Sequence, residues 1–410
     1  MIGPRPDHGT ARSRRADERR LRQPDPGLAP VIVAARRTPF GTAGKAFAEV
    51  ELIDLVAPVL RALVADLPGA PPVDDVVLGN TRGPGGNPAR VAALSAGLGL
   101  EVPGVTVDRQ CGSGQEAIHV AAAQVASGRA LLVLAGGGES ASTQPIRLWP
   151  GRHGAEPVPF DRGPFAPAEI GDPDMGPAAE NVAREVGISR ERQDAYAVRS
   201  HARTLAARDA GVFDAEIVPI GGVRVDERPR LLSERVLSRF PPAFEPGGTV
   251  TAGNSCGVSD GAALVAVVPE WLRAELGLPG LRIVDWTATA LHPTLPGLGP
   301  VSAVTRVLER AGRPLTSVDV LEVTEAFAAQ VLGCTDRLGV AVEPSGAGPV
   351  VCPDGGALAL GHPWGASAAA LLVRLFDRLV RRGLGTVGVA TCGIGGGQGL
   401  ATLVEVVRPG

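Results

Sequence analysis

The sequence has few aromatic residues, a single lysine and no long apolar run. Aromatic residues make up 3% of the 410 residues, and Lys45 is the only lysine. No apolar run reaches the roughly 18–20 residues of a membrane-spanning helix. Residues 1–29 contain seven arginines and no apolar core, which excludes a secretory signal and predicts a disordered extension. We therefore expect a cytoplasmic protein with no membrane as partner.

The charge and the cysteines exclude further classes of function. A formal net charge of -3 and a pI of about 6.1 give no electrostatic reason to expect nucleic acid as a partner. The five cysteines are far apart and form no CxxC pair: they are Cys111, Cys256, Cys334, Cys352 and Cys392. This pattern predicts neither a disulfide framework nor a metal site.

Glycine is abundant, with 55 residues in a composition that is 44% hydrophobic. This combination predicts closely packed helices in two or three units. Apolar strands alternate with helices, which indicates an α/β layered fold. Strands are expected over 30–35, 74–79, 105–108, 130–135 and 386–390, and helices over 50–65, 87–97 (with Asn87 as cap), 115–127 and 366–380. Prolines, glycines and charges interrupt the pattern over 143–247 and indicate an inserted subdomain.

Two parts of the chain share the same order of elements. Cys111 precedes a small-residue helix, a strand and the glycine run 136–138. His362 precedes the same series, which ends at the glycine run 395–397. A duplicated α/β unit would place the two residues at equivalent helix starts, facing each other.

Cys111 stands between an apolar strand and a buried helix, within the sequence CGSG. Free N–H groups and the dipole at a helix start favour a thiolate, so we expect a lowered thiol pKa and a nucleophile. Gly112 and Gly114 leave room for a substrate to approach the backbone. The alternative for such a cysteine is a buried structural residue.

His362 lies in the sequence GHPWGAS, where Pro363 suits the first turn of a helix. A helix start lowers the pKa of an imidazole, so His362 is expected to be neutral and to take a proton from Cys111. A structural or exposed histidine is the alternative. Cys392, after an apolar strand, is a candidate second acid/base. Glu325 either anchors a histidine or caps a helix.

Seven segments together resemble motifs of the thiolase family, in the family's order. They are GNPAR (86–90), CGSG (111–114), MGPAAENVA (175–183), TAGNSCGVSDGAA (251–263), TEAFAAQ (324–330), GGALALGHPWGAS (355–367) and GGGQG (395–399). The resemblance implies a five-layered αβαβα fold of two duplicated halves. It assigns residues 30–142 and 248–284 to an N-terminal thiolase domain, 143–247 to a loop domain that covers coenzyme A, and 285–410 to a C-terminal thiolase domain.

The resemblance also implies a reversible Claisen condensation and thiolysis of acyl-CoA esters. Cys111 matches the acyl-accepting nucleophile, His362 its base and Cys392 the second acid/base. The N–H groups of Cys111 and Gly395 would form one oxyanion hole, and His362 with a water on Thr324 a second. Coenzyme A and acyl-CoA are then substrates, no cofactor is tightly bound, and a homodimer or homotetramer is expected.

Three positions depart from the family pattern. Thr324 stands where relatives carry Asn or His before EAF. The segment from Cys392 to the glycine run is one residue longer than usual. A gapless alignment on the glycines puts Gly393 where the catalytic cysteine belongs, and we expect a one-residue bulge to restore Cys392 to that place. Cys256, next to Ser255, stands where a serine often contacts the pantetheine arm, and a thiol is a poorer hydrogen-bond partner.

Two more residues are candidates for substrate contact. Arg230 resembles an arginine near the nucleotide end of coenzyme A, or it is a solvated surface residue. Met175 is expected to line the acyl pocket. The leading function is a 3-ketoacyl-CoA thiolase or acetyl-CoA acyltransferase. The alternatives are a ketosynthase-like condensing enzyme with a different extender or carrier, and a weakly active thiolase-fold subunit that binds acyl-CoA in a hetero-oligomer.

Overall fold

Strands and helices alternate along the chain, as the sequence predicts. The computed structural model describes residues 25–343, 346 and 348–409. The first half contributes β1 (Pro30–Arg37), β3 (Asp75–Gly79), β4 (Gly104–Val107), β5 (Val133–Glu139) and β8 (Ser259–Pro269). The second half contributes β9 (Gly280–Ala290), β10 (Val320–Val323), β11 (Val350–Val351), β12 (Val387–Ile394) and β13 (Gln398–Val407). Regular structure begins with a 3-10 turn over Pro26–Leu28, and residues 1–24 of the predicted extension lie outside the described residues.

The two halves have the same sheet topology. The strand order is β1-β8-β5-β3-β4 in the first half and β9-β13-β12-β10-β11 in the second. In each half the first three strands of this order are antiparallel and the last three are parallel. The predicted duplication is therefore visible in the topology. Because β9 is the counterpart of β1, the second half begins at Gly280, and the predicted boundary at 284/285 falls inside this strand.

The two halves join through a short contact between their first strands. Val31 and Ile32 of β1 pair with Arg282 and Leu281 of β9, which makes one hydrogen-bonded path through both sheets. The short strand β2 (Gly41–Thr42) pairs beside this path with β8.

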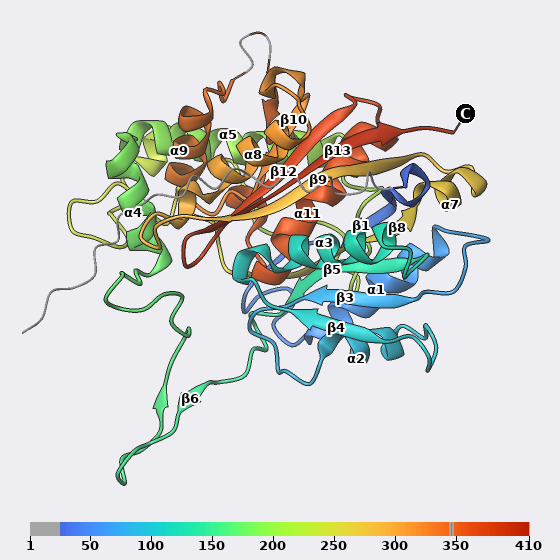
Figure 1. The fold of residues 1–410 in the computed structure, drawn as a ribbon. Coiled ribbons are helices and arrows are strands. Elements are labelled where there is room, and N and C mark those ends of the chain that lie inside the picture. Colours follow the sequence, from blue (N-terminus) through green and yellow to red (C-terminus); the bar gives the residue numbers. More distant parts are fainter. Residues whose placement is uncertain (1–24, 344–345, 347, 410) are drawn as a thin grey trace, which may run out of the picture.

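Helices cover both sheets and fill the space between them (Figure 1). The middle layer holds α3 (Ser113–Ala126) and α11 (Trp364–Leu375), and their apolar residues form one cluster with strands of both halves. The outer layer of the first half holds α1 (Leu52–Ala65) and α2 (Pro88–Ser95). The outer layer of the second half holds α8 (Gly299–Arg310) and α9 (Ala328–Leu338). This is the five-layered αβαβα arrangement.

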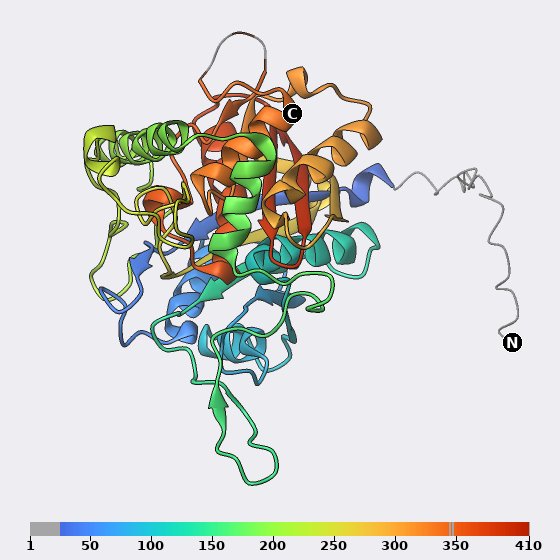
Figure 2. The same ribbon diagram turned by 90° about the vertical axis from the view of Figure 1, so that its left-hand side faces the viewer.

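The inserted segment has two parts. A hairpin of β6 (Leu148–Trp149) and β7 (Val158–Pro159) projects away from the sheets (Figure 1). The helices α4 (Met175–Val186) and α5 (Arg190–Asp209) lie against the second half, where they join its apolar cluster (Figure 2). A short helix α6 (Glu234–Leu237) follows, and α7 (Glu270–Glu275) links β8 to β9. No helix of the described chain is long and apolar enough to cross a membrane.

Two local expectations differ from the structure. Asn87 precedes α2 with a left-handed backbone (φ 57°), but its side chain does not cap the helix. It instead donates to the Gly104 carbonyl oxygen and accepts from Thr106, which ties α2 to β4. The helix predicted over 366–380 ends at Leu375 and continues as a wider turn over Phe376–Arg381.

Glycines allow the starts of α3 and α11 to meet closely. A Cβ on Gly137 of β5 would lie 1.8 Å from the Gly365 carbonyl oxygen, and one on Gly114 of α3 would lie 2.5 Å from the same atom. A Cβ on Gly365 would lie 2.4 Å from the Gly138 carbonyl oxygen. These clashes are with backbone, which cannot rotate away as a side chain can, so the layers fit only without side chains here.

We expect Gly137→Ala to destabilise the fold, because the added methyl group would separate β5 from the start of α11. The expected loss in the free energy of unfolding is about 1–3 kcal/mol, measured by urea denaturation. Gly163→Ala is the matched control, since a Cβ there meets nothing within 4 Å. Equal stability of the two variants would contradict the proposed role of this contact.

Candidate active site

Cys111 lies in a tight turn between β4 and α3. A 3-10 turn over Gln110–Gly112 joins the strand to the helix, and Gln110 has a φ of 43°. The Ser113 hydroxyl holds this left-handed backbone, since it donates to the Gln110 carbonyl oxygen at 2.7 Å and accepts from the Arg109 N–H at 2.8 Å. Backbone strain held by its surroundings is frequent at functional sites. The turn therefore fixes the direction of the Cys111 side chain.

A cavity of about 280 Å³ opens beside Cys111. Five of the residues predicted from the sequence line it: Cys111, His362, Met175, Ser255 and Cys256. The inserted segment forms part of the wall through Arg162, Phe165 and Phe244, in addition to Met175. A largely apolar cavity with a few converging polar groups is the usual form of a small-molecule site.

His362 lines this cavity, and one of its ring nitrogens has no hydrogen-bond partner among the described residues. Its Nδ1 lies 2.6 Å from the Ser367 hydroxyl, which donates its own hydrogen to the Pro363 carbonyl oxygen at 2.9 Å. Because that hydrogen is committed, Nδ1 carries a proton and donates to Ser367. Nε2 then holds a free lone pair, and it has no hydrogen-bond partner among the described residues. His362 is therefore arranged to accept a proton at Nε2.

Burial sets the protonation of both groups. It lowers the pKa of His362 to about 4, so the imidazole is neutral, as predicted, although the cause is burial and not the helix start. Burial also raises the pKa of the Cys111 thiol above its ordinary value. The predicted lowering of the Cys111 pKa is therefore wrong for the free enzyme, because desolvation of the thiolate outweighs the helix start. A neutral thiol needs a base, and His362 can supply it.

Cys392 is packed against Cys111 but not on the cavity wall. It is fully buried, and its thiol donates to the Gly393 carbonyl oxygen at 3.2 Å and the Cys111 carbonyl oxygen at 3.5 Å. The predicted bulge is absent, because β12 and β13 pair in regular register through Ile394. Because successive residues of a strand face opposite sides of the sheet, Gly393 faces the side opposite to Cys392. Gly393 lines an inner cavity of about 20 Å³ that Cys111 also lines.

Gly395 opens the three-residue turn between β12 and β13. It packs on the ring of Phe165, where a Cβ would lie 2.7 Å from the ring edge. Its neighbour Ile394 contacts Gly112, since a Cβ there would lie 2.5 Å from the Ile394 side chain. The residue that precedes Gly395 therefore contacts the residue that follows Cys111.

Thr324 lies behind the cavity, at the end of β10. It is 2% exposed, and its hydroxyl has no hydrogen-bond partner within the described residues. Its N–H donates to the Thr391 carbonyl oxygen of β12 at 3.1 Å. Thr324 does not line the cavity, so the structure gives it no direct contact with a substrate there.

Glu325 caps a helix, and within the described part of the chain it has no hydrogen bond to a histidine. Its carboxylate accepts from Tyr196 at 2.7 Å, Ser200 at 2.5 Å and the Leu358 N–H at 3.3 Å. Leu358 belongs to the first turn of α10 (Ala357–Leu360), which ends two residues before His362. A carboxylate at a helix start satisfies free N–H groups there. Glu325 therefore supports the segment that carries His362.

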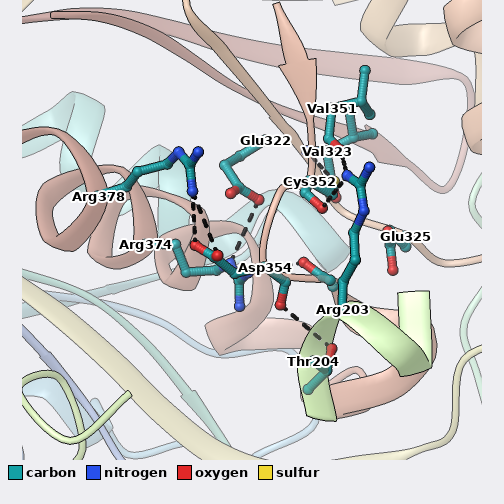
Figure 3. A network of polar contacts seen from close by, with 12 residues as sticks. Arg203, Thr204, Glu322, Val323, Glu325, Val351, Cys352, Asp354, Arg374 and Arg378 are labelled. Carbon is teal, nitrogen blue, oxygen red and sulfur yellow. Dashed lines mark hydrogen bonds and ion pairs between the residues drawn. The ribbon is translucent and has the colours of Figure 1, made fainter. Parts of the chain in front are cut away.

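A buried charge network holds the same segment from the other side (Figure 3). Arg374 of α11 donates to the Gly355 carbonyl oxygen at 2.9 Å and lies 3.5 Å from Glu322. Asp354 lies 3.4 Å from Arg378, and its carbonyl oxygen accepts from Thr204 (Figure 3). Burial raises the pKa of Glu322 to about 7, and the charge of Arg374 opposes this rise.

Glu139 is a residue of the site that the sequence analysis missed. Its buried carboxylate accepts from the N–H groups of Thr81, Arg82 and Gly365 at 3.0–3.2 Å. It thereby fixes the start of α11 to the cavity wall of the first half. Burial raises its pKa to about 7, and these hydrogen bonds oppose the rise. The only sequence signal is its place directly after the glycine run of β5.

Arg82 was missed as well. Its guanidinium lies 4.4 Å from the ring centre of Trp364, and both residues line the cavity. Arg82 belongs to the first half and Trp364 to the start of α11 in the second half. Their cation–π contact therefore joins the two halves at the cavity wall.

Three predicted contact residues differ in how they are placed. Ser255 commits its hydroxyl to the Thr251 carbonyl oxygen at 2.7 Å. Cys256 faces the cavity, and burial raises its thiol pKa to about 12. Arg230 is exposed and does not line the cavity, which fits the solvated alternative. No group of three or more His, Cys, Asp or Glu in the described ranges is placed to hold a metal ion.

Comparison with known families identifies the chain. The family model of the thiolase N-terminal domain matches residues 30–271, and that of the thiolase C-terminal domain matches residues 278–406. The chain belongs to the thiolase family. This thiolase is 42% identical over 384 residues to YhfS of Bacillus subtilis, with 92% of this chain and 99% of YhfS covered.

Solved structures agree with this assignment. The acetyl-CoA acetyltransferase of Bacillus anthracis superposes with a TM-score of 0.85 at 37% identity, covering 92% of this chain and 99% of its own. Human mitochondrial 3-ketoacyl-CoA thiolase in complex with CoA gives a TM-score of 0.85 at 34% identity, with 93% and 99% covered. The thiolase fold is thus established for this chain, and the thiolase is an acyltransferase.

The raised pKa of Cys111 predicts how its reactivity depends on pH. We expect alkylation of Cys111 by iodoacetamide to accelerate continuously from about pH 6 to about pH 9, because the thiolate fraction rises tenfold per pH unit below the pKa. Mass spectrometry of the Cys111 peptide measures the rate, with Cys111→Ala correcting for the other thiols. A plateau reached near pH 5 would indicate a thiolate–imidazolium pair and contradict this assignment.

Proposed function

We propose that this thiolase catalyses reversible Claisen condensation and thiolysis of acyl-CoA and 3-ketoacyl-CoA esters through a thioester on Cys111. The observation that carries the proposal is that Cys111 and His362 line one cavity of about 280 Å³, with Nε2 of His362 unpaired among the described residues. Coenzyme A serves as a substrate and not as a resident cofactor. The CoA bound in the human relative supports this part of the proposal.

In the first half-reaction Nε2 of His362 takes the proton of Cys111. The thiolate attacks the carbonyl carbon of the acyl-CoA, and the carbon–sulfur bond to coenzyme A then breaks. The leaving thiolate takes the proton of Cys392, which leaves an acyl group on Cys111, an imidazolium on His362 and a thiolate on Cys392. The N–H groups of Cys111 and Gly395 are proposed to stabilise the oxyanion, and the contact of Ile394 with Gly112 supports this placement.

In the second half-reaction a proton leaves the α-carbon of a second acyl-CoA. The Cys392 thiolate is the proposed acceptor on the family resemblance; because Cys392 packs against Cys111 but does not line the cavity, this step requires β12 to shift toward the substrate. The resulting enolate attacks the acyl group, and Cys111 leaves as a thiolate that takes its proton back from His362, so both cysteines and the imidazole return to their starting states. Thiolysis runs the same steps in reverse, with Cys392 activating the thiol of coenzyme A.

The remaining parts of the proposal concern substrate contacts, assembly and location. Met175 and Cys256 are proposed to contact the substrate because both line the cavity. Ser255 contributes less, since its hydroxyl already has an acceptor. Arg230 would contact the nucleotide end of coenzyme A from the surface. A homodimer or homotetramer and a cytoplasmic location stay predictions.

The acyl-enzyme is the direct test of this function. Incubation with acetyl-CoA should add the mass of one acetyl group to the intact protein, and Cys111→Ala should abolish the addition. Adding acetoacetyl-CoA and coenzyme A should consume the enolate absorbance of the ketoacyl ester. Acylation without thiolysis would favour the ketosynthase-like alternative, and coenzyme A binding without acylation would favour the weakly active subunit.

Ser367 provides a second test, because its hydroxyl sets the tautomer of His362. Ser367→Ala should lower the rate of acylation by about 10- to 100-fold, as for other groups that orient a reactive histidine. Stopped-flow release of coenzyme A measures this rate. Ser140→Ala is the control, since Ser140 bonds the Val50 carbonyl oxygen elsewhere in the fold. An unchanged rate in Ser367→Ala would show that the tautomer is set otherwise.

A further inference from the structure

We propose that Arg82 is a specificity-determining residue that binds a carboxylate at the far end of the acyl chain. The substrates of this thiolase would then be acyl-CoA and 3-ketoacyl-CoA esters of dicarboxylic acids. The inference rests on the proposed function, because it names the class of acyl group that Cys111 carries. Its basis is a cation on the wall of the catalytic cavity that forms no ion pair with a carboxylate of the described residues.

The catalytic cavity is lined by two arginines, which differ in how their charges are balanced. Arg162 forms ion pairs with Asp172 at 3.0 Å and with Asp174 at 2.8 Å. Among the described residues, the guanidinium of Arg82 has one side-chain acceptor, the amide oxygen of Gln144, at a long 3.4 Å. A guanidinium carries five N–H donors. Most of those of Arg82 are therefore left for a ligand.

The surroundings of Arg82 compensate its charge only in part. Burial and the nearby charge of Arg147 lower the pKa of Arg82, although Asp161 and Glu139 oppose the lowering. The Glu139 carboxylate is already occupied by N–H groups, and Asp161 is exposed to solvent. Burial also acts to lower the pKa of Arg162, but there the two aspartates prevail and raise it. A partly buried cation without a close counter-charge gains most from an anionic ligand.

Arg82 follows a residue that contacts the reactive turn. The Thr81 hydroxyl donates to the Gln110 carbonyl oxygen at 3.3 Å, and Gln110 directly precedes Cys111. Thr81, Arg82, Gln110 and Cys111 all line the same cavity. An acyl group on Cys111 therefore begins beside the wall to which Arg82 belongs.

Arg82 also lines a second cavity, of about 150 Å³. The ionisable residues of its wall are Arg82, Arg147 and Asp161, which together carry a net charge of one positive. Arg147 donates to the Thr81 carbonyl oxygen at 3.1 Å, which keeps it close to the catalytic cavity. A carboxylate, with one negative charge, matches this net charge. A dicarboxylic acyl chain would thus extend from Cys111 past Thr81 toward the two arginines.

Two other roles for Arg82 predict different behaviour. A phosphate of coenzyme A is also an anion, but it is common to every acyl-CoA. A purely structural role would follow from the contact of Arg82 with the ring of Trp364 at 4.4 Å. Both roles affect all acyl-CoA esters alike, whereas a carboxylate subsite affects only the chains that end in a carboxylate. The ratio of two acylation rates therefore separates them.

The test compares succinyl-CoA with butyryl-CoA, whose acyl chains have the same number of carbons and differ in the terminal carboxylate. Glutaryl-CoA and pentanoyl-CoA form a second, longer pair. Stopped-flow release of coenzyme A gives the second-order rate constant of acylation, and intact mass identifies the acyl group on the protein. Cys111→Ala corrects for non-enzymatic acylation of other nucleophiles.

Three variants of the full-length protein are needed. Arg82→Leu removes the charge, and Arg82→Lys keeps it without the fork of the guanidinium. Arg152→Leu is the matched control, because Arg152 is an exposed arginine between β6 and β7 that lines neither cavity.

We expect the unsubstituted protein to be acylated faster by the carboxylated ester of at least one pair. Arg82→Leu should lower the ratio of the carboxylated to the neutral rate constant by about 10- to 100-fold, as for loss of a hydrogen bond between charged groups. Arg82→Lys should keep part of this ratio, and Arg152→Leu should leave it unchanged.

Three results would overturn the inference. Absence of a preference for the carboxylated ester in both pairs would show that no carboxylate subsite exists. An equal loss of both rate constants in Arg82→Leu would indicate a phosphate contact or a structural role. Failure of the unsubstituted protein to be acylated by any of these esters or by acetyl-CoA would refute the proposed function itself, and no variant is needed to observe it.

Discussion

The site depends on the contact between the starts of α3 and α11, where backbone meets backbone. Gly114, Gly137 and Gly365 leave no space for a side chain between the layers. Each helix start follows a reactive residue, so the same contact that closes the middle layer brings Cys111 and His362 to one cavity. Glu139 adds a polar bond across this contact by accepting from the Gly365 N–H. The packing of the two halves and the assembly of the site therefore depend on the same contact.

Burial of the titratable groups is the second general property of the site. Burial raises the pKa of Cys111, Cys256 and Cys392 and lowers that of His362, so all four are uncharged near neutral pH. A neutral thiol and a neutral imidazole avoid the cost of an isolated buried charge in the free enzyme. Charge then appears only as the proton moves, at the moment when the surrounding donors can stabilise it. Nε2 of His362, which has no partner among the described residues, is an acceptor available at that moment.

The sequence carries the fold and the two main reactive residues because these depend on local patterns. Alternating strands and helices, the repeated order of elements and the glycines around Cys111 and His362 are all readable along the chain. Glu139 and Ser367 escaped notice because their roles come from contacts across the fold. The pKa of Cys111 was predicted with the wrong sign, because the depth of burial is not a local property. The regular register at Cys392 likewise depends on the neighbouring strand β13. Asn87 does not cap α2 because its side chain bonds residues of β4.

The place of β8 has a consequence for how the chain folds during synthesis. This strand lies between β1 and β5 in the first sheet, yet residues 143–247 separate it from the other strands of that sheet in the chain. A ribosome that has made β1 to β5 has therefore released a sheet with an open centre. The inserted segment must emerge before β8 can close the gap, and its helices α4 and α5 pack against a second half that is made only after β8. Until β8 is made, the edges of β1 and β5 that it pairs with have no partner strand, and unpaired strand edges favour aggregation.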